Sequence, residues 1–159
     1  MIIIGERVYF KTTSIDDIDY IIKNELDPEN SDFVLNWSKE KHLDSLNDEN
    51  ICRFTIYSKN DERIGFIILC GYKDKKVIEF KRFVISQKGQ GYGKEAMQVC
   101  INFVFEELKA HKMWLDVLES NEIGIHLYKS CGFKEEAKLI DHDYYKGKYQ
   151  SWFIMSIIK

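Results

Sequence analysis

A glycine-rich loop between an expected strand and an expected helix constrains this chain more than any other feature. The strand, Val77–Ser86, is rich in β-branched and aromatic residues. Within the helix, residues 91–109, apolar side chains recur at three- and four-residue spacing, as on one buried face. Gly89, Gly91 and Gly93 lie at the junction. Because glycine tolerates positive φ and a helix N-terminus presents unpaired N–H groups, this loop is suited to a phosphate or pyrophosphate.

Two common nucleotide-binding loops do not fit these residues. The P-loop pattern GxxxxGK[ST] fails because Gly93-Lys94 is followed by Glu95, where a magnesium-binding hydroxyl is needed. The dinucleotide pattern GxGxxG fails because no glycine stands at the required place after Gly91 and Gly93. The loop therefore indicates a phosphate ligand held in another way.

Two segments resemble the GNAT family of N-acetyltransferases. Lys88–Gly93 (KGQGYG) resembles the family's (Gln/Arg)-x-x-Gly-x-(Gly/Ala) loop, which grips the pyrophosphate of acetyl-coenzyme A (acetyl-CoA). Asn121–Phe133 (NEIGIHLYKSCGF) resembles its Asn-x-x-(Ala/Gly)-x-x-x-Tyr-x-x-x-Gly-Phe segment. The resemblance runs from about Arg63 to Lys159, and is nearest to the branch with ribosomal-protein N-terminal and spermidine acetyltransferases. Lys88 departs from the usual Gln or Arg, and the connection before the glycines is short and lacks the frequent proline.

The remaining pattern predicts one α/β domain over residues 1–159. Ser14 and Asp17 form a capping-box-like helix start, and Ser38 is suited to cap a second helix. Strands are expected at 8–11, 51–58, 63–70, 77–86, 113–118, 133–139 and 149–158, helices at 14–26, 38–46, 91–109 and 122–131, and a loop at 27–31. The resemblance implies a mostly antiparallel central sheet flanked by helices, in which one parallel strand pair splays apart around the thioester arm of the cofactor.

Composition excludes several classes of function. The net charge of −3 over 159 residues gives no electrostatic case for nucleic acid. No apolar run approaches about 18 residues, so no membrane span is expected. The four cysteines lack CxxC spacing and are expected to be reduced thiols of a cytoplasmic protein. The four histidines share no spacing for a metal, so no metal site is expected.

The resemblance assigns the chemistry to two side chains. Acetyl transfer to an amine needs a neutral amine, a donor to the oxyanion and a proton for the thiolate. Tyr128 is the implied general acid, although a tyrosine here could also simply pack against the sheet. Glu79, on the central strand, is the candidate base, acting directly or through a water; the alternative is a strand carboxylate paired with Lys81 or Arg82.

The cofactor-binding residues are expected on the central strand, the glycine loop and the following helix start. A bulge at the end of the strand is implied to leave backbone amides free for the oxyanion. Asn121 holds the pantetheine arm, caps a helix, or does both, and Lys94 is either a ligand or a solvated helix residue. The full set is Phe83, Val84, Ile85, Lys88, Gly89, Gln90, Gly91, Tyr92, Gly93, Lys94 and Asn121.

The acceptor is the least defined part of the expected reaction. Carboxylates in the N-terminal helices and at Asp141 and Asp143 favour a cationic amine such as a polyamine or a protein N-terminus, although carboxylates at helix starts also act as caps. Aromatic residues wall the acceptor pocket, form a homodimer contact, or only pack: Trp37, Tyr144, Tyr145, Tyr149 and Trp152. The alternative to an N-acetyltransferase is a non-catalytic acyl-CoA sensor or interaction module on the same fold.

Overall fold

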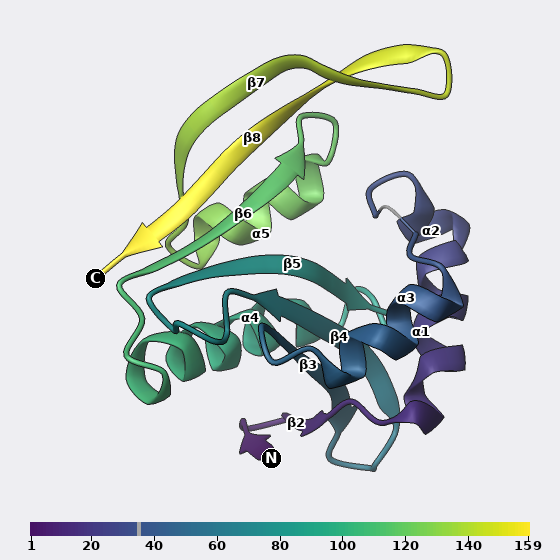
Figure 1. Cartoon of the computed structure of the whole chain (residues 1–159), viewed down its shortest axis with the longest axis vertical. Helices are drawn as coiled ribbons and strands as arrows, with labels where there is room; N and C mark the ends of the chain where they lie inside the picture. The colour runs from purple at the N-terminus through teal and green to yellow at the C-terminus, as the bar shows by residue number, and fades with distance from the viewer. Residues whose placement is uncertain (35) are drawn as a thin grey trace.

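One eight-stranded sheet organises the computed structural model, which describes residues 1–34 and 36–159 (Figure 1). Its strands follow the order β1-β2-β3-β4-β5-β6-β8-β7. The strands are β1 (Ile2–Ile4), β2 (Val8–Thr12), β3 (Ile51–Ser58), β4 (Arg63–Cys70), β5 (Val77–Ile85), β6 (Lys112–Leu118), β7 (Lys134–Tyr145) and β8 (Lys148–Ile158). The helices are η1 (Ile15–Asp17), α1 (Ile18–Leu26), α2 (Pro28–Ser31), α3 (Lys39–Asp44), η2 (Ser45–Asn47), α4 (Tyr92–Asn102), the π-helical turn η3 (Phe103–Glu107) and α5 (Glu122–Ser130).

The parallel pair β5 and β6 separates after three residues. The two strands pair only from Val77 opposite Lys112 to Glu79 opposite Trp114. Beyond that point β5 continues beside β4, while β6 continues beside β8. The two strands therefore diverge (Figure 1), as the family resemblance implied, and the other strand pairs are antiparallel.

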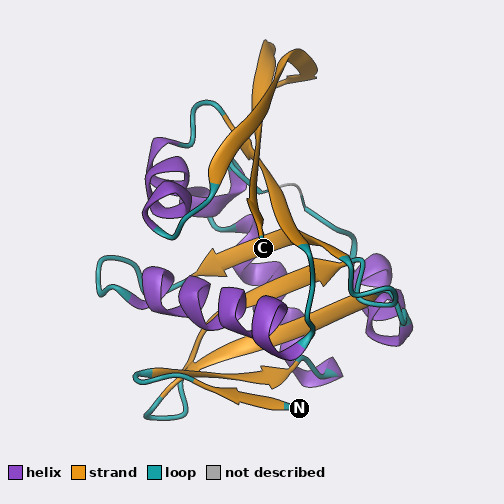
Figure 2. Cartoon of the chain, turned by 90° about the vertical axis from the view of Figure 1, so that its left-hand side faces the viewer, coloured by secondary structure: helices purple, strands orange, loops and turns teal. Residues whose placement is uncertain are grey.

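Apolar side chains of the central strand β4 alternate between two cores. Ile67 and Leu69 belong to the cluster that includes buried residues of α4, whereas Phe66 and Ile68 pack with Ile21 of α1 on the opposite face. This alternation is the period-two pattern of a strand. Figure 2 shows α4 lying along one face of the sheet, with the N-terminal helices on the other side. The covered sheet thus provides a rigid frame for the divergence of β5 and β6.

The C-terminal hairpin of β7 and β8 extends beyond the body of the sheet (Figure 1). Its connection is the Lys146-Gly147 turn, where both residues have positive φ. Register shifts lie between Glu135 and Ala137 and between Leu139 and Asp143. These irregularities let β7 run twelve residues, well past the expected end at residue 139.

Most expected elements are present, with four differences. Strand β1 was not expected, and Pro28–Ser31 forms a one-turn helix rather than a loop, with Asp27 accepting a hydrogen bond from Glu29 N–H at its start. The helix expected over 91–109 ends as a π-helical turn at Glu107. The strand expected over 133–139 runs instead from Lys134 to Tyr145. The capping box of Ser14 and Asp17 is present and opens a 3-10 turn that leads into α1.

Candidate active site

A cleft of about 980 Å³ opens where β5 and β6 separate. Its lining comes from the glycine loop, from β5, β6 and α5, and from the segment around α2 and α3. The glycine loop meets α2 directly, because Lys88 donates to Asn30. The cleft is large enough for an extended ligand that contacts both the loop and the diverging strands. Its lining includes Glu29, Trp37, Lys81, Arg82, Lys88, Gly91, Asp116, Asn121 and Tyr128.

The glycine loop has the backbone that a phosphate site requires. Gly89 and Gly91 have φ of +76° and +77°, a conformation that glycine adopts without strain. Gly91 directly precedes α4 and has no side chain to cap it, so the first amides of this helix remain available to an anion. Lys88 donates to Oδ1 of Asn30 at 2.6 Å, a neutral partner that leaves the lysine charge uncompensated. These features fit the pyrophosphate of a CoA.

Within the expected cofactor set, two loop residues lie outside the cleft. Gln90 and Lys94 are both exposed and do not line it. The carbonyl of Gln90 instead accepts a hydrogen bond from Arg7 at 3.0 Å. Asn121 lines the cleft and also caps α5, because its Oδ1 accepts from Gly124 N–H at 3.0 Å. Its side-chain amide group is thus held in place by the helix that it starts.

The bulge in β5 lies earlier than the resemblance implied. Ile68 of β4 pairs with Arg82 and Leu69 pairs with Phe80, so Lys81 is the extra residue. The segment from Phe83 to Ile85, where the bulge was expected, is in regular register with β4. The expectation of a bulge at 83–85 was wrong.

Amides of this segment nevertheless face the gap. Ser86 donates its N–H to Ile64 of β4 at 2.8 Å. N–H directions alternate along an antiparallel strand, so the N–H of Val84 also points toward β4. The N–H groups of Phe83 and Ile85 point the other way, toward the space between β5 and β6. The N–H groups of Phe83 and Ile85 can thus contact a carbonyl oxygen in the cleft. They face the cleft because β6 has separated from β5, and not because of a bulge.

Tyr128 of α5 lies in the cleft wall against two aromatic rings. Its ring centroid is 6.5 Å from that of Phe80 and 5.9 Å from that of Phe133, both with edge-to-face geometry. Burial raises the pKa of the Tyr128 phenol above its ordinary value of about 10, and the negative charge of Asp116 raises it further. The Tyr128 side chain both packs against its neighbours and lines the cleft, so a packing role is compatible with the role of a general acid. It stays protonated at neutral pH, as a proton donor must.

Glu79 is separated from the cleft. Its Oε1 accepts from Lys81 Nζ at 2.9 Å, its side chain is 19% exposed, and it does not line the cleft. This is the paired strand carboxylate that was the alternative to a base. β5 and β6 are still joined at Glu79, so this residue lies before the gap opens.

Asp116 of β6 is a cleft residue that sequence reasoning missed. It lies two residues after the last paired position of β6, where the strand has left β5. Asp116 is exposed and opens into the cleft, where the neighbouring protein still desolvates it in part. This desolvation raises the pKa of Asp116, with Glu79 adding to the rise and with Lys81 and Arg82 opposing it. A carboxylate with a raised pKa inside a cleft is suited to accept a proton. The local pattern, an acidic residue in an otherwise apolar strand, was the available signal.

A buried polar network joins the cleft to α1 and α3. Nε2 of His42 lies 2.8 Å from Glu25 Oε2, and Arg82 Nε lies 3.6 Å from Glu25 Oε1. Arg53 Nη2 lies 3.0 Å from His42 Nδ1. Because arginine only donates, Nδ1 accepts and the proton lies on Nε2, which donates to Glu25. The guanidinium carbon of Arg82 also lies 5.4 Å from the centroid of the Trp37 ring, so this network fixes one wall of the cleft.

Replacing Glu25 with alanine is expected to lower the free energy of unfolding by about 3–5 kcal/mol, because His42 and Arg82 would lose a buried anionic partner. Urea unfolding at pH 7 measures this change. Asp19→Ala, on the same helix, is the matched control: its ion pair with Lys39 is exposed and contributes little. Equal stability of the two variants would contradict the structural role of Glu25.

Few of the N-terminal carboxylates expected to attract a cationic acceptor reach the cleft. Asp17 is paired with Arg63, Asp19 with Lys39, and Glu25 with the network above. Asp27 caps α2. Glu29 is the member of this set that lines the cleft. Among the described residues, the carboxylates that line the cleft are therefore Glu29 and Asp116, beside basic groups such as Lys41.

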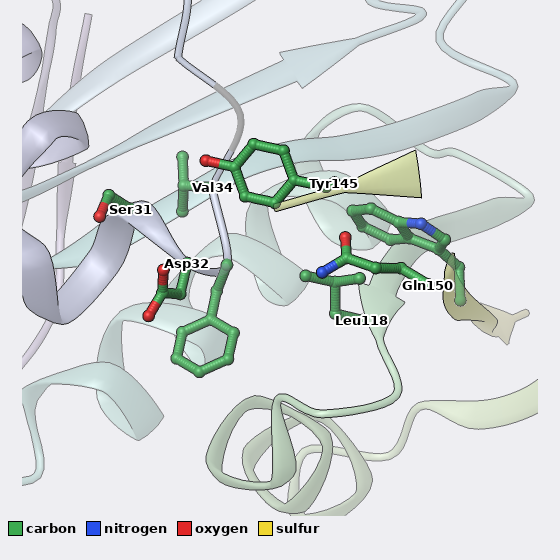
Figure 3. A pocket seen from close by; sticks show the side chains of 8 residues that line it. Ser31, Asp32, Val34, Leu118, Tyr145 and Gln150 are labelled. Atoms are coloured by element: carbon green, nitrogen blue, oxygen red, sulfur yellow. The ribbon is translucent and has the colours of Figure 1, made fainter. Parts of the chain in front are cut away.

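A small pocket beside the cleft lies between the segment after α2 and the C-terminal hairpin. Val34 lines it from one side and Tyr145 and Gln150 from the other (Figure 3). Lys146 and Asp32 join the same two parts through an ion pair of 2.6 Å. The hairpin is thereby tied to the segment that follows α2, beside the cleft.

The expected aromatic cluster divides between cleft and surface. Trp37 and Trp152 line the cleft, and Tyr145 lines the small pocket. Tyr144 and Tyr149 stack edge to face on the hairpin and are 65% and 70% exposed. The homodimer contact expected of this cluster stays a prediction.

Across 1–34 and 36–159, no group of three or more His, Cys, Asp or Glu side chains is arranged to hold a metal ion. In the same part of the chain, no helix is both long and apolar enough to cross a bilayer.

The diverging strands, the glycine loop and the cleft define an acyl-CoA-dependent acyltransferase. The model of the Acetyltransferase (GNAT) family matches residues 17–133, and the chain belongs to this family. It is an N-acetyltransferase whose acyl donor is acetyl-CoA. The resemblance inferred from the loop and the Asn121–Phe133 segment is thus confirmed.

Named relatives are polyamine enzymes. The chain is 27% identical over 124 residues to spermidine N(1)-acetyltransferase of Vibrio cholerae, which covers 76% of this chain and 71% of the relative. It is 25% identical over 122 residues to the Escherichia coli K12 enzyme of that name, covering 76% of this chain and 63% of the relative, slightly less than two thirds. The crystal structure of the Vibrio cholerae spermidine N-acetyltransferase with CoA and spermine superposes with a TM-score of 0.86 at 22% identity, over 96% of this chain and 95% of that one. This superposition confirms the fold.

Proposed function

We propose that this chain transfers the acetyl group of acetyl-CoA directly to a primary amine of the polyamine type, as one domain over residues 1–159. The observation that carries the proposal is the continuous cleft from the glycine loop to Tyr128, Asp116 and the N-terminal helices. The named relatives support a polyamine acceptor, and so do the two carboxylates of the cleft, Asp116 and Glu29. Acetyl-CoA supplies a thioester; the residues of the chain supply binding, orientation and proton transfer.

The base in this proposal is Asp116 instead of Glu79. An alkylammonium with a pKa of about 10.4 is neutral in only about one molecule in 2,500 at pH 7, a handicap of roughly 4.6 kcal/mol. Asp116 accepts the proton that the acceptor nitrogen loses, directly or through a water. The nitrogen can then form a bond to the acetyl carbon. Glu79, held by Lys81 outside the cleft, supports this step only through its charge.

Tyr128 completes the proton balance. As the bond between the acetyl carbon and sulfur breaks, Tyr128 donates its phenolic proton to the departing thiolate. The N–H groups of Phe83 and Ile85 stabilise the negative charge that develops on the carbonyl oxygen. Lys88 and the amides at Gly91, Tyr92 and Gly93 hold the pyrophosphate. The second proton of the acceptor nitrogen passes to the Tyr128 phenolate as the adduct collapses, and Asp116 returns its proton to solvent. The products are therefore an acetamide, a free thiol and one proton released to solvent.

The cellular setting follows from the same residues. We place the enzyme in the cytoplasm, supported by four cysteines that are all free thiols. A homodimer is supported by the exposed aromatic pair Tyr144 and Tyr149 on the projecting hairpin. A peptide N-terminus is the second acceptor class that the open cleft admits.

The test is mass-spectrometric detection of acetylated product from acetyl-CoA over a panel of polyamines, amino acids, aminoglycosides and N-terminal peptides. We expect product with a polyamine, and about 100-fold less or lower still with the Tyr128→Phe variant at the same enzyme concentration. Product formed only with peptides would replace the polyamine by a protein N-terminus. Tight CoA binding without any product over the panel would overturn the enzymatic proposal in favour of an acyl-CoA sensor.

A further inference from the structure

Arg7, in the turn between β1 and β2, contacts the glycine loop from the far end of the sequence. Its Nη1 donates to the Gln90 carbonyl at 3.0 Å, and its Nε donates to Glu95 Oε2 at 2.9 Å. Its guanidinium carbon lies 5.2 Å from the centroid of the Tyr92 ring. One side chain thus touches the loop, the first residue of α4 and the first turn of that helix. Residue 7 lies outside the 17–133 region that the family model matches.

The hydrogen bond to Gln90 sets the direction of a neighbouring amide. The peptide bonds of the described chain are trans, so the carbonyl of Gln90 and the N–H of Gly91 point in opposite directions within one rigid plane. Arg7 holds the carbonyl outside the cleft, and Gly91 lines the cleft. The Gly91 N–H is therefore aimed away from Arg7 and toward the space where the pyrophosphate binds. Without this bond the Gln90–Gly91 peptide plane could rotate, because Gly91 lies at one end of it and Gly89 directly precedes Gln90.

The turn at Arg7 also keeps an acidic side chain away from the phosphate site, through two backbone N–H groups and one side-chain N–H group. Glu95 lies in the first turn of α4, where a carboxylate is drawn to the free helix amides. Instead, its oxygens accept from Arg7 N–H at 2.6 Å, from Arg7 Nε and from Val8 N–H at 3.2 Å. Partial burial alone would raise the pKa of Glu95, but these hydrogen bonds outweigh it and lower the pKa, so the group is ionised at neutral pH. An ionised carboxylate released near the loop would compete with a phosphate.

We propose that Arg7 is a positioning residue for acetyl-CoA, whose side chain orients the Gly91 amide toward the pyrophosphate and adds one hydrogen bond to the two backbone N–H groups that hold Glu95 away from it. The inference rests on the proposed function, because it assigns Arg7 to the donor half of that reaction. Acetyl donors with and without a pyrophosphate should therefore respond differently to the loss of Arg7. A donor without the pyrophosphate does not use the loop and should be indifferent to Arg7.

The experiment compares acetyl-CoA with acetyl-pantetheine, which has the same thioester but no pyrophosphate or nucleotide. For Arg7→Ala we expect the KM for acetyl-CoA to rise about tenfold or more, from the loss of charge-assisted hydrogen bonds. We expect kcat/KM for acetyl-pantetheine to change less than about twofold, which is within ordinary scatter for a residue without contact to the ligand. Arg7→Lys should lie between, since one ammonium cannot make both contacts. Lys11→Ala removes a cation from the neighbouring strand β2, where it lies over Tyr9 and Tyr57, and should change neither donor.

Two outcomes would overturn the inference. Equal losses with both donors would show that Arg7 only supports the fold, and an unchanged KM for acetyl-CoA would remove it from the donor site. Calorimetric titration with CoA separates this inference from the proposed function, because it needs no acceptor. If wild-type protein binds CoA but acetylates no amine, the proposed function fails, and the Kd of Arg7→Ala for CoA, raised or unchanged, still decides the role of Arg7.

Discussion

Tyr128→Phe should lower kcat by about 100-fold or more while leaving the fold and the affinity for acetyl-CoA unchanged. The variant removes one oxygen and its proton, so the departing thiolate must take its proton from solvent. The packing of the ring against Phe80 and Phe133 is preserved, because phenylalanine keeps the same edge-to-face contacts. Steady-state kinetics with saturating acceptor, together with calorimetric titration of CoA, measure the two quantities separately.

The pH profile provides a second readout for Tyr128. Burial and the charge of Asp116 raise the pKa of the phenol, so its proton is retained through the neutral and mildly alkaline range. We therefore expect no loss of wild-type activity from ionisation of Tyr128 below about pH 10, the ordinary pKa of tyrosine. An unchanged kcat in Tyr128→Phe, with the chemical step shown to be rate-limiting, would remove this residue from the mechanism.

Elements with a strong local signal were predictable, and those fixed by distant contacts were not. The bounds of β3 and β4 match the expectation because each is a short run of buried residues closed by turn residues such as Asn60 and Asp61. β1 is three residues long and mostly exposed, so its pairing with β2 has no sequence signature. The extension of β7 to Tyr145 depends on its pairing with β8, since most of the strand is exposed. Pairing between strands, and not local propensity, determined these differences.

The candidate site divides in the same way. The glycine loop and Tyr128 were found because each belongs to a contiguous motif. Asp116 and Arg7 were missed because their roles depend on where β6 leaves β5 and on which residue reaches the loop from β1 and β2. Glu79, the base expected from the sequence, lies on β5 where β5 and β6 are still paired, and it does not line the cleft, so we propose Asp116 in its place. The register at which two strands separate is a property of the whole sheet.

Asp116→Asn should lower kcat/KM about 100-fold at pH 7, because the acceptor would lose the group that takes its proton. The defect should shrink as pH approaches the pKa of the acceptor amine, about 10.4, where the neutral amine no longer depends on a base. In the wild type, desolvation raises the pKa of Asp116, so the acid limb of kcat/KM should lie above the ordinary aspartate value of about 3.9. A pH series of kcat/KM for both proteins checks all three expectations.

A stability measurement separates a catalytic from a structural role for Asp116, because its substitution should lower the activity without lowering the Tm. A carboxyl whose pKa is raised by folding favours the folded state while protonated, and this contribution is lost as pH rises through the raised pKa. At pH 7 the charged Asp116 therefore opposes folding, and Asp116→Asn should keep or raise the Tm while activity falls. Glu79→Gln is the matched control, since it also neutralises a carboxylate near Lys81 but outside the cleft, and it should retain most of the activity. A large loss in Glu79→Gln, with Asp116→Asn near wild type, would return the base to β5 and refute the assignment to Asp116.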